Sequence, residues 1–135
     1  MNTIDVKHDS EFASTPTFVF PMSMGFDLYS CENKLIESGR KDFVDTGLSI
    51  RIPEGTYAVV NNRASLLAIN VEVSNTTFFP FYFGHVIILL TNYGQHDLPI
   101  MAGDKIATLV LLPMDQPLVR IYDPNSAIEA QDDDE

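Results

Sequence analysis

Basic residues are scarce in this chain. Eight Lys and Arg stand against nineteen Asp and Glu in 135 residues, which gives a formal net charge of −11. Five of the acids lie in the last seven residues, Glu129 to Glu135. Phosphate backbones and anionic membranes are repelled by such a surface unless Lys and Arg cluster locally, and no such cluster is present. We therefore expect neither nucleic acid nor a membrane as a partner.

Cysteine and long apolar runs are also scarce. Cys31 is the single cysteine, so no internal disulfide can form. The N-terminus lacks the basic segment and apolar stretch that are typical of a signal peptide. The longest apolar run, Val86 to Leu90, has five residues, far short of the ~20 that span a bilayer. These absences predict an intracellular protein.

The apolar residues that are present follow the period of β-strands. Leu48, Ile50 and Ile52 alternate with polar residues, the pattern of a strand with one buried face. Residues 63–69 favour at most one short helix, for which Asn62 is a candidate N-cap. Further runs of Val, Ile, Phe and Tyr between turn residues predict strands at 17–20, 57–60, 71–73, 86–90, 106–112 and 118–122.

The pattern as a whole predicts one all-β domain with no internal repeat. A chain of this length is enough for one core and too short for two. We assign the domain to residues 1–123, with an ordered core from about 16 to 123, and expect a flexible acidic tail at 124–135.

Three segments carry motifs in a fixed order: Gly25-Phe26-Asp27-Leu28, Arg63-Ala64-Ser65-Leu66 and Gly103-Asp104-Lys105-Ile106-Ala107. Together with Val44-Asp45-Thr46-Gly47-Leu48, this series resembles the motifs of the trimeric dUTPase family. The resemblance covers residues 16 to about 113. It implies a distorted jelly-roll fold that assembles as a homotrimer, with each active site built from several subunits.

The same resemblance raises a difficulty for catalysis. Members of the family hydrolyse dUTP between the α and β phosphates with Mg²⁺, and a hairpin Asp orients the attacking water. Phe79 stands at the position of that Asp, Phe81 at a second Asp and Phe83 at an Arg. Tyr82, which in the family packs against the deoxyribose, is retained. No acid occurs between Ser74 and Tyr93, so a shift of the alignment does not restore one.

The phosphate-binding motifs are altered as well. Arg63 keeps the guanidinium that suits phosphate, but Ala64 replaces the following serine and Ser65 comes one position late. Thr108 replaces a phosphate-binding Gln, and residues 123–135 contain none of the glycines of the family's C-terminal arm. The resemblance leaves these candidates for residual nucleotide binding: Asp27, Arg63, Ser65, Tyr82 and Thr108.

Each of these residues also has a structural explanation. Gly25 and Asp27 fit a turn glycine and a side chain that caps a turn. Arg63 fits an ion pair with a neighbouring carboxylate as well as it fits a phosphate. The aromatic residues near Pro80 either pack in the core or an interface, or form an exposed interaction surface; they are Phe78, Phe79, Phe81 and Phe83.

From these residues we predict a dUTPase-fold protein that has lost catalysis and acts as a non-catalytic interaction or regulatory trimer. Analogy with viral proteins that resemble dUTPase derivatives points to a viral origin. If the protein is viral, we expect it in the cytoplasm or nucleus of a host cell. No metal site is expected, since His8, His85 and His96 have no metal-ligand spacing, and Mg²⁺ enters only if nucleotide binding is retained. Two alternatives stay open. One is an active, divergent dUTP pyrophosphatase that uses Asp27 and a further carboxylate, and the other is a nucleotide-binding module without turnover.

Overall fold

Short runs of branched and aromatic residues form the strands of the protein. The structure is a computed structural model that describes residues 3–18 and 25–126. Its elements are β1 (Asp5–His8), β2 (Phe26–Tyr29), β3 (Lys34–Ile36), β4 (Lys41–Arg51), β5 (Thr56–Asn61), α1 (Ala64–Leu67), β6 (Val71–Val73), β7 (Thr77–Phe78), β8 (Phe83–Asn92), β9 (Leu98–Ile100), β10 (Lys105–Pro113) and the 3-10 turn η1 (Pro124–Ser126).

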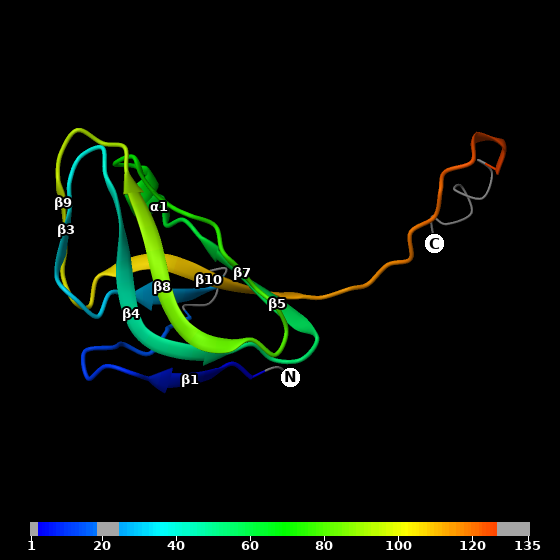
Figure 1. The fold of residues 1–135 in the computed structure, drawn as a ribbon, viewed down its shortest axis with the longest axis horizontal. Helices are drawn as coiled ribbons and strands as arrows, with labels where there is room; N and C mark the ends of the chain where they lie inside the picture. The colour runs from blue at the N-terminus through cyan, green and yellow to red at the C-terminus, as the bar shows by residue number, and fades with distance from the viewer. Residues whose placement is uncertain (1–2, 19–24, 127–135) are drawn as a thin grey trace.

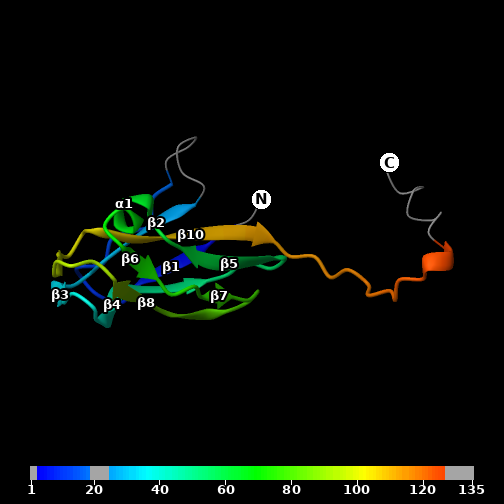
Figure 2. The same ribbon diagram turned by 90° about the horizontal axis from the view of Figure 1, so that it is seen from above.

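Eight of these strands form two four-stranded sheets. One sheet has the order β1-β4-β8-β6 and the other the order β2-β10-β5-β7, while β3 and β9 form a separate two-stranded ribbon. Neighbouring strands run antiparallel in all three. The two sheets lie one above the other as layers (Figures 1 and 2). The predicted all-β fold with one short helix is confirmed.

The core lies between the two layers and follows from the alternation along each strand. In β8, Val86, Ile88 and Leu90 are buried, whereas the residues between them point outward. Leu109 of β10 and Val60 of β5 meet them from the other sheet and are fully buried. Burying one such side chain stabilises the fold by about 1.5–3 kcal/mol, so the period of two determines which face of each strand turns inward.

The single helix is shorter than the predicted segment. α1 spans four residues, and Asn62 does not cap it. The Asn62 Oδ1 atom instead accepts a hydrogen bond of 2.6 Å from the Val73 amide, so this side chain ties the helix start to β6. In the part of the chain that the structure describes, no helix is long and apolar enough to cross a membrane.

The two ends of the chain differ from the sequence-based expectation. β1 lies before residue 16, where the ordered core was expected to begin, and pairs with β4 through Val6 and Ile50. After Pro113 the chain leaves the body (Figure 1). The strand predicted at 118–122 is wrong: this segment forms no strand, and Leu118 is 97% exposed, because it lies away from the sheets of the described residues (Figure 1).

Two other predicted segments fall partly outside the described residues. Of the strand predicted at 17–20, Thr17 forms an isolated bridge to Asp27, and residues 19–20 lie outside. Of the predicted acidic tail, residues 127–135 lie outside as well.

A histidine ties three segments of the first sheet together. His85 of β8 places Nδ1 at 2.7 Å from Asp9 Oδ2 and Nε2 at 2.6 Å from Asp45 Oδ1. Asp9 follows β1, and Asp45 lies in β4. Both ring nitrogens can donate to the two carboxylates only when the imidazole is protonated. The hydrogen bond to Asp9 is the main cause that raises the pKa of His85, and Asp45 adds to the effect.

The carboxylate partner shifts in the opposite direction. Hydrogen bonds from Ser49 and then His85 lower the pKa of Asp9 below 3.8. The aspartate contribution to stability is therefore present above about pH 3.8 and is lost as the pH falls through the lowered pKa. The histidine contribution is complete below about pH 6.5 and is lost as the pH rises through the raised pKa.

We accordingly expect the free energy of unfolding to depend on His85 most strongly in mildly acidic solution. The difference between the wild type and His85→Gln, measured by urea denaturation at one protein concentration, should be larger at about pH 5.5 than at about pH 9. Glutamine keeps a donor but cannot be protonated. A difference that is constant, or that grows with pH, would contradict the protonated bridge.

Candidate functional site

The first motif lies where β2 closely approaches β10. A Cβ atom on Gly25 would overlap the Leu109 carbonyl oxygen and lie 3.0 Å from the Thr108 methyl group. Glycine is therefore required for this close approach of the two backbones. As a result, β2 pairs with β10 in a register that sets Asp27 directly across from Thr108.

Asp27 lies between two cations from other segments. Arg63 Nη1, at the N-terminus of α1, donates a hydrogen bond of 2.8 Å to Asp27 Oδ1. Lys105 Nζ, at the start of β10, lies 3.4 Å from the other carboxylate oxygen. Asp27 is 7% exposed, whereas the Arg63 and Lys105 side chains are 24% and 43% exposed. The cluster thus holds two positive charges and one negative charge, with both cations reachable from solvent.

Arg63 keeps hydrogen-bonding capacity after it pairs with Asp27. The guanidinium has five N–H donors, and one of its terminal nitrogens bonds to the carboxylate. Its Nε atom is buried and has no partner within the described residues. The ion pair expected as one explanation of Arg63 is therefore present, and it leaves donors available for an anion.

The structure brings only some of the predicted site residues together. Thr108 is half-buried and lies across from Asp27 on one side and Asn61 on the other. Ser65 lies in α1, two residues after Arg63, and is exposed. Tyr82 belongs to a different part of the fold, where its ring packs against Phe78 at 4.9 Å between centroids.

Sequence reasoning missed Lys105 as a site residue. It is the third residue of the Gly103-Asp104-Lys105 motif, which we interpreted as a turn followed by a strand. The turn is present, since the Asp104 carboxylate accepts a hydrogen bond from the Met101 amide. Lys105 could have been found from its place in the strand that pairs with β2. It lies across from Tyr29, two residues along β2 from Asp27, and a long side chain reaches such a diagonal neighbour.

The aromatic hairpin between β7 and β8 is only partly buried. Phe78 is 8% exposed and pairs with Ala58 of β5, so its prediction as a surface residue is wrong. The alternation of β7 turns its side chain into the core. Phe79, Phe81 and Phe83 are 65%, 71% and 51% exposed, and their role as an interaction surface stays a prediction.

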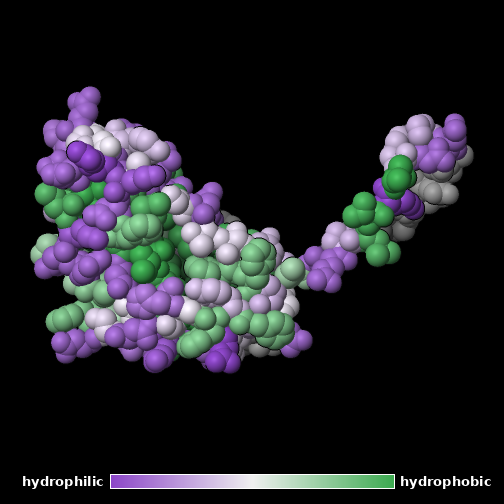
Figure 3. Space-filling model, viewed as in Figure 1, coloured by the Kyte–Doolittle hydropathy of each residue, from purple (hydrophilic) through white to green (hydrophobic). Residues whose placement is uncertain are grey.

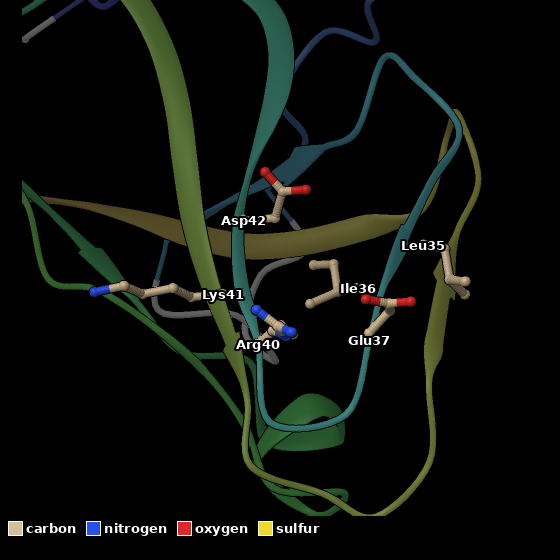
Figure 4. A pocket seen from close by; sticks show the side chains of 6 residues that line it. All are labelled: Leu35, Ile36, Glu37, Arg40, Lys41 and Asp42. Atoms are coloured by element: carbon tan, nitrogen blue, oxygen red, sulfur yellow. The ribbon is translucent and has the colours of Figure 1, made fainter.

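A hollow elsewhere on the molecule contains none of these motif residues. It lies between β3 and β4, has a volume of about 330 Å³ and is lined by Leu35, Ile36, Glu37, Arg40, Lys41 and Asp42. Figure 4 shows Lys41 directed to the opposite side of β4 from Glu37. Since neither the motifs nor the Asp27 cluster reach this hollow, we do not assign it to the candidate site.

The fold and the Asp27 cluster define the class of protein. It is an all-β sandwich in which motifs in a fixed order bring one carboxylate and two cations together. The dUTPase family model matches residues 12–134. The chain belongs to the dUTPase family, as the resemblance of the motifs predicts.

Named relatives agree with this assignment. A probable deoxyuridine 5′-triphosphate nucleotidohydrolase of Schizosaccharomyces pombe is 40% identical over 103 residues, which cover 76% of this chain and 74% of that protein. The deoxyuridine 5′-triphosphate nucleotidohydrolase of Clostridium tetani is 36% identical over 115 residues, which cover 83% and 79%.

Solved structures show the same fold. The dUTPase of phage phi11 of S. aureus has a TM-score of 0.79 at 22% identity, covering 90% of this chain and 97% of that one. The dUTPase of Staphylococcus bacteriophage 80alpha has a TM-score of 0.81 at 20% identity, covering 95% and 93%. A homotrimer is consistent with the family.

These relatives correct the predicted function. We predicted a non-catalytic trimer because Phe79 stands where the family resemblance places an Asp. Relatives at 33–40% identity over most of the chain are, however, named as nucleotidohydrolases. The prediction of lost catalysis is therefore contradicted, and the active alternative is better supported. The error lay in concluding from altered motif positions, above all Phe79 and also Ala64 and Thr108, that the whole chain had lost catalysis.

The buried ion pair gives a test of the cluster's contribution to stability. Asp27→Asn should lower the free energy of unfolding by about 1–3 kcal/mol, since it weakens the hydrogen bond from Arg63 and removes the charge that pairs with Lys105. Asp42→Asn is the matched control. Asp42 forms an ion pair of 3.4 Å with Lys34, and its side chain is 46% exposed, against 10% for Asp27, so this substitution should cost less than about 1 kcal/mol. Chemical denaturation at one protein concentration measures both, and equal losses would show that Asp27 has no special structural role.

Proposed function

We propose that this protein is a dUTP nucleotidohydrolase, which cleaves dUTP to dUMP and pyrophosphate. The observation that carries the proposal is the 40% identity to the S. pombe relative over three quarters of the chain. The geometry of the motifs supports it, because the same three segments that carry the resemblance come together around Asp27.

Arg63 and Lys105 provide the phosphate-binding side of the proposed site. In a chain with a net charge of −11, most of the surface repels a triphosphate. The guanidinium and ammonium groups create a local exception, and both are partly exposed. Arginine suits a phosphate group because its donors form a planar fork.

Asp27 is the carboxylate that we place beside the attacking water. A carboxylate has about four lone-pair sites. Arg63 contacts one oxygen and Lys105 the other, so two sites are left to accept a hydrogen bond from water. Phe79 cannot take this role, because a phenyl ring neither accepts a proton nor holds a water by a charged hydrogen bond.

Magnesium fits this site as part of the substrate. The described residues contain no group of three or more His, Cys, Asp or Glu side chains placed to hold a metal ion. Mg²⁺ in nucleotide enzymes is commonly held by one or two carboxylates together with substrate phosphates. We propose that Mg·dUTP is the form that binds, with its charge partly neutralised before it meets Asp27.

We place the nucleoside end of the substrate at the hairpin between β7 and β8. Tyr82 is half-buried, and its hydroxyl group lies against Gly84, where a Cβ atom would clash with it. In the proposed enzyme, Tyr82 packs against the deoxyribose as the family resemblance implies. A homotrimer would let the hairpin of one copy and the Asp27 cluster of another share one nucleotide.

The proposal is tested by pyrophosphate release from dUTP with Mg²⁺. The wild type should release pyrophosphate, and Arg63→Ala should lower kcat/KM by about 100-fold, since it removes a charged donor from the phosphates. Arg40→Ala is the matched control, because Arg40 is exposed and lies on the separate hollow beside β3; it should retain wild-type turnover.

Two results would overturn the proposal. One is wild-type protein that binds Mg·dUTP in calorimetry but releases no pyrophosphate. The other is release at the same rate from the wild type and Arg63→Ala, which would mark the activity as a contaminant.

A further inference from the structure

The N-terminal segment crosses from one sheet of the sandwich to the other. All of β1 pairs with β4 in the first sheet, and Thr17 forms a bridge to Asp27 of β2 in the second sheet. The Thr17 carbonyl accepts a hydrogen bond of 2.8 Å from the Asp27 amide, and the Thr17 hydroxyl lies 2.6 Å from the Tyr29 hydroxyl. We call residues 5–17 the strap, because they connect the first sheet to the backbone of the candidate site.

Few apolar side chains hold the strap against the body. β1 has four residues at the edge of its sheet, and its one apolar residue, Val6, packs only partly against the core. Figure 3 shows hydrophilic residues along the lower edge of the body, where Figure 1 shows β1. Segments with few buried apolar contacts open locally at a smaller cost than the whole fold. The polar contacts of the strap therefore determine how firmly it is held.

Asp9 attaches the strap to the first sheet. Its amide donates a hydrogen bond of 2.8 Å to the Gly47 carbonyl, and its carboxylate accepts one from the Ser49 hydroxyl and lies 2.7 Å from His85 Nδ1. The other ring nitrogen of His85 faces Asp45. A neutral imidazole has one N–H donor and one lone pair. Once the ring loses its proton, one of its nitrogens therefore turns a lone pair towards a carboxylate.

Of the two carboxylates, Asp9 is the one that can move away. Asp45 lies within β4, where it pairs with Ile87 of β8, and its carboxylate also accepts a hydrogen bond from the Gly47 amide. Asp9 comes after the last residue of β1 and lies outside the paired strand. Deprotonation of His85 therefore weakens the attachment of the strap before it disturbs β4.

Acids outnumber cations around His85. Lys7 and Ser49 lie in one row with His85 across three strands, and Lys7 Nζ is 3.8 Å from Asp9 but its side chain is 70% exposed. The Cys31 thiol also titrates nearby, and burial, followed by Asp45, raises its pKa. Neighbouring carboxylates favour the charged imidazole. The charged residues on the segments around His85 are Asp5, Lys7 and Asp9 from the strap, Asp45 and Arg51 from β4, and Glu32, which binds the Asp45 amide.

We propose that the strap is a proton-dependent latch, which is held across both sheets when His85 is charged and is released when His85 is neutral. The two ends of the strap act together, because His8 Nε2 lies 2.9 Å from Thr15 Oγ1 and closes the loop between them. Release at Asp9 therefore also weakens the hydrogen bond between Thr17 and the Asp27 amide. The latch concerns the backbone support of Asp27 and does not depend on the proposed hydrolysis.

Amide hydrogen exchange of the full chain measures opening at both ends of the strap. The data are expressed as protection factors, which remove the intrinsic pH dependence of exchange. In the wild type, the protection factors of the Asp9 and Asp27 amides should fall about 10-fold or more between about pH 5.5 and about pH 8.5, since a hydrogen bond to a charged group is lost. In His85→Gln, both should be nearly the same at the two pH values, because glutamine cannot be protonated.

Two controls accompany this measurement. His96→Gln removes an exposed histidine outside the strap and should keep the wild-type fall. The Val60 amide, which donates to the Thr76 carbonyl at 3.0 Å, should stay more protected than either strap amide, because local opening costs less than global unfolding. If His85→Gln does not fold, Asp9→Asn removes the carboxylate on the strap and should abolish the fall as well.

Three results would overturn the proposal. One is an equal fall in the wild type and His85→Gln. Another is a response of the Asp9 amide without one of the Asp27 amide, which would show that the two ends do not act together. The last is protection of the Val60 amide no greater than that of the strap amides, which would show that the whole fold opens. Exchange is read without dUTP, so a failure of the proposed hydrolysis does not alter any of these outcomes.

Discussion

The carboxylate of Asp27 is the group on which the site depends. It is nearly buried, and the cations that hold it come from the N-terminus of α1 and the start of β10. Those two segments are far apart in the sequence. They meet because β10 pairs with β5, which ends at Asn61 just before Arg63, and β2, which carries Asp27, lies directly on β10. That close approach requires a glycine at position 25. One ion-pair cluster therefore joins β2, the start of β10 and the N-terminus of α1.

The first sheet serves the molecule in a different way. Its inner face supplies much of the core, and His85 bridges the segment after β1 to β4. Its outer face carries Phe43 and Ile87, which the single chain leaves exposed.

Sequence reasoning reached the fold and part of the site. Alternating apolar residues identify strands such as β4 and β10, and the motif order identifies Asp27 and Arg63, because both signals are local. β1 was missed because its apolar residue Val6 stands between charged residues, and because its pairing with β4 is a long-range contact that the local sequence does not show. The strand at 118–122 was predicted from composition, which does not show whether a sheet edge is available. Lys105 was missed because its partner is set by strand register.

The function was the hardest property to predict from the sequence. Phe79 departs from the family pattern at one position, whereas the similarity to the relatives extends over most of the chain. An exposed ring at that position excludes one residue as a base but leaves the cluster of Asp27, Arg63 and Lys105 in place. The most direct measurement is ³¹P NMR of Mg·dUTP incubated with the protein in ¹⁸O-labelled water. We expect the signals of dUMP and pyrophosphate, with the label in one of the two products. Persistence of the three dUTP resonances, or formation of dUDP and phosphate, would contradict the account.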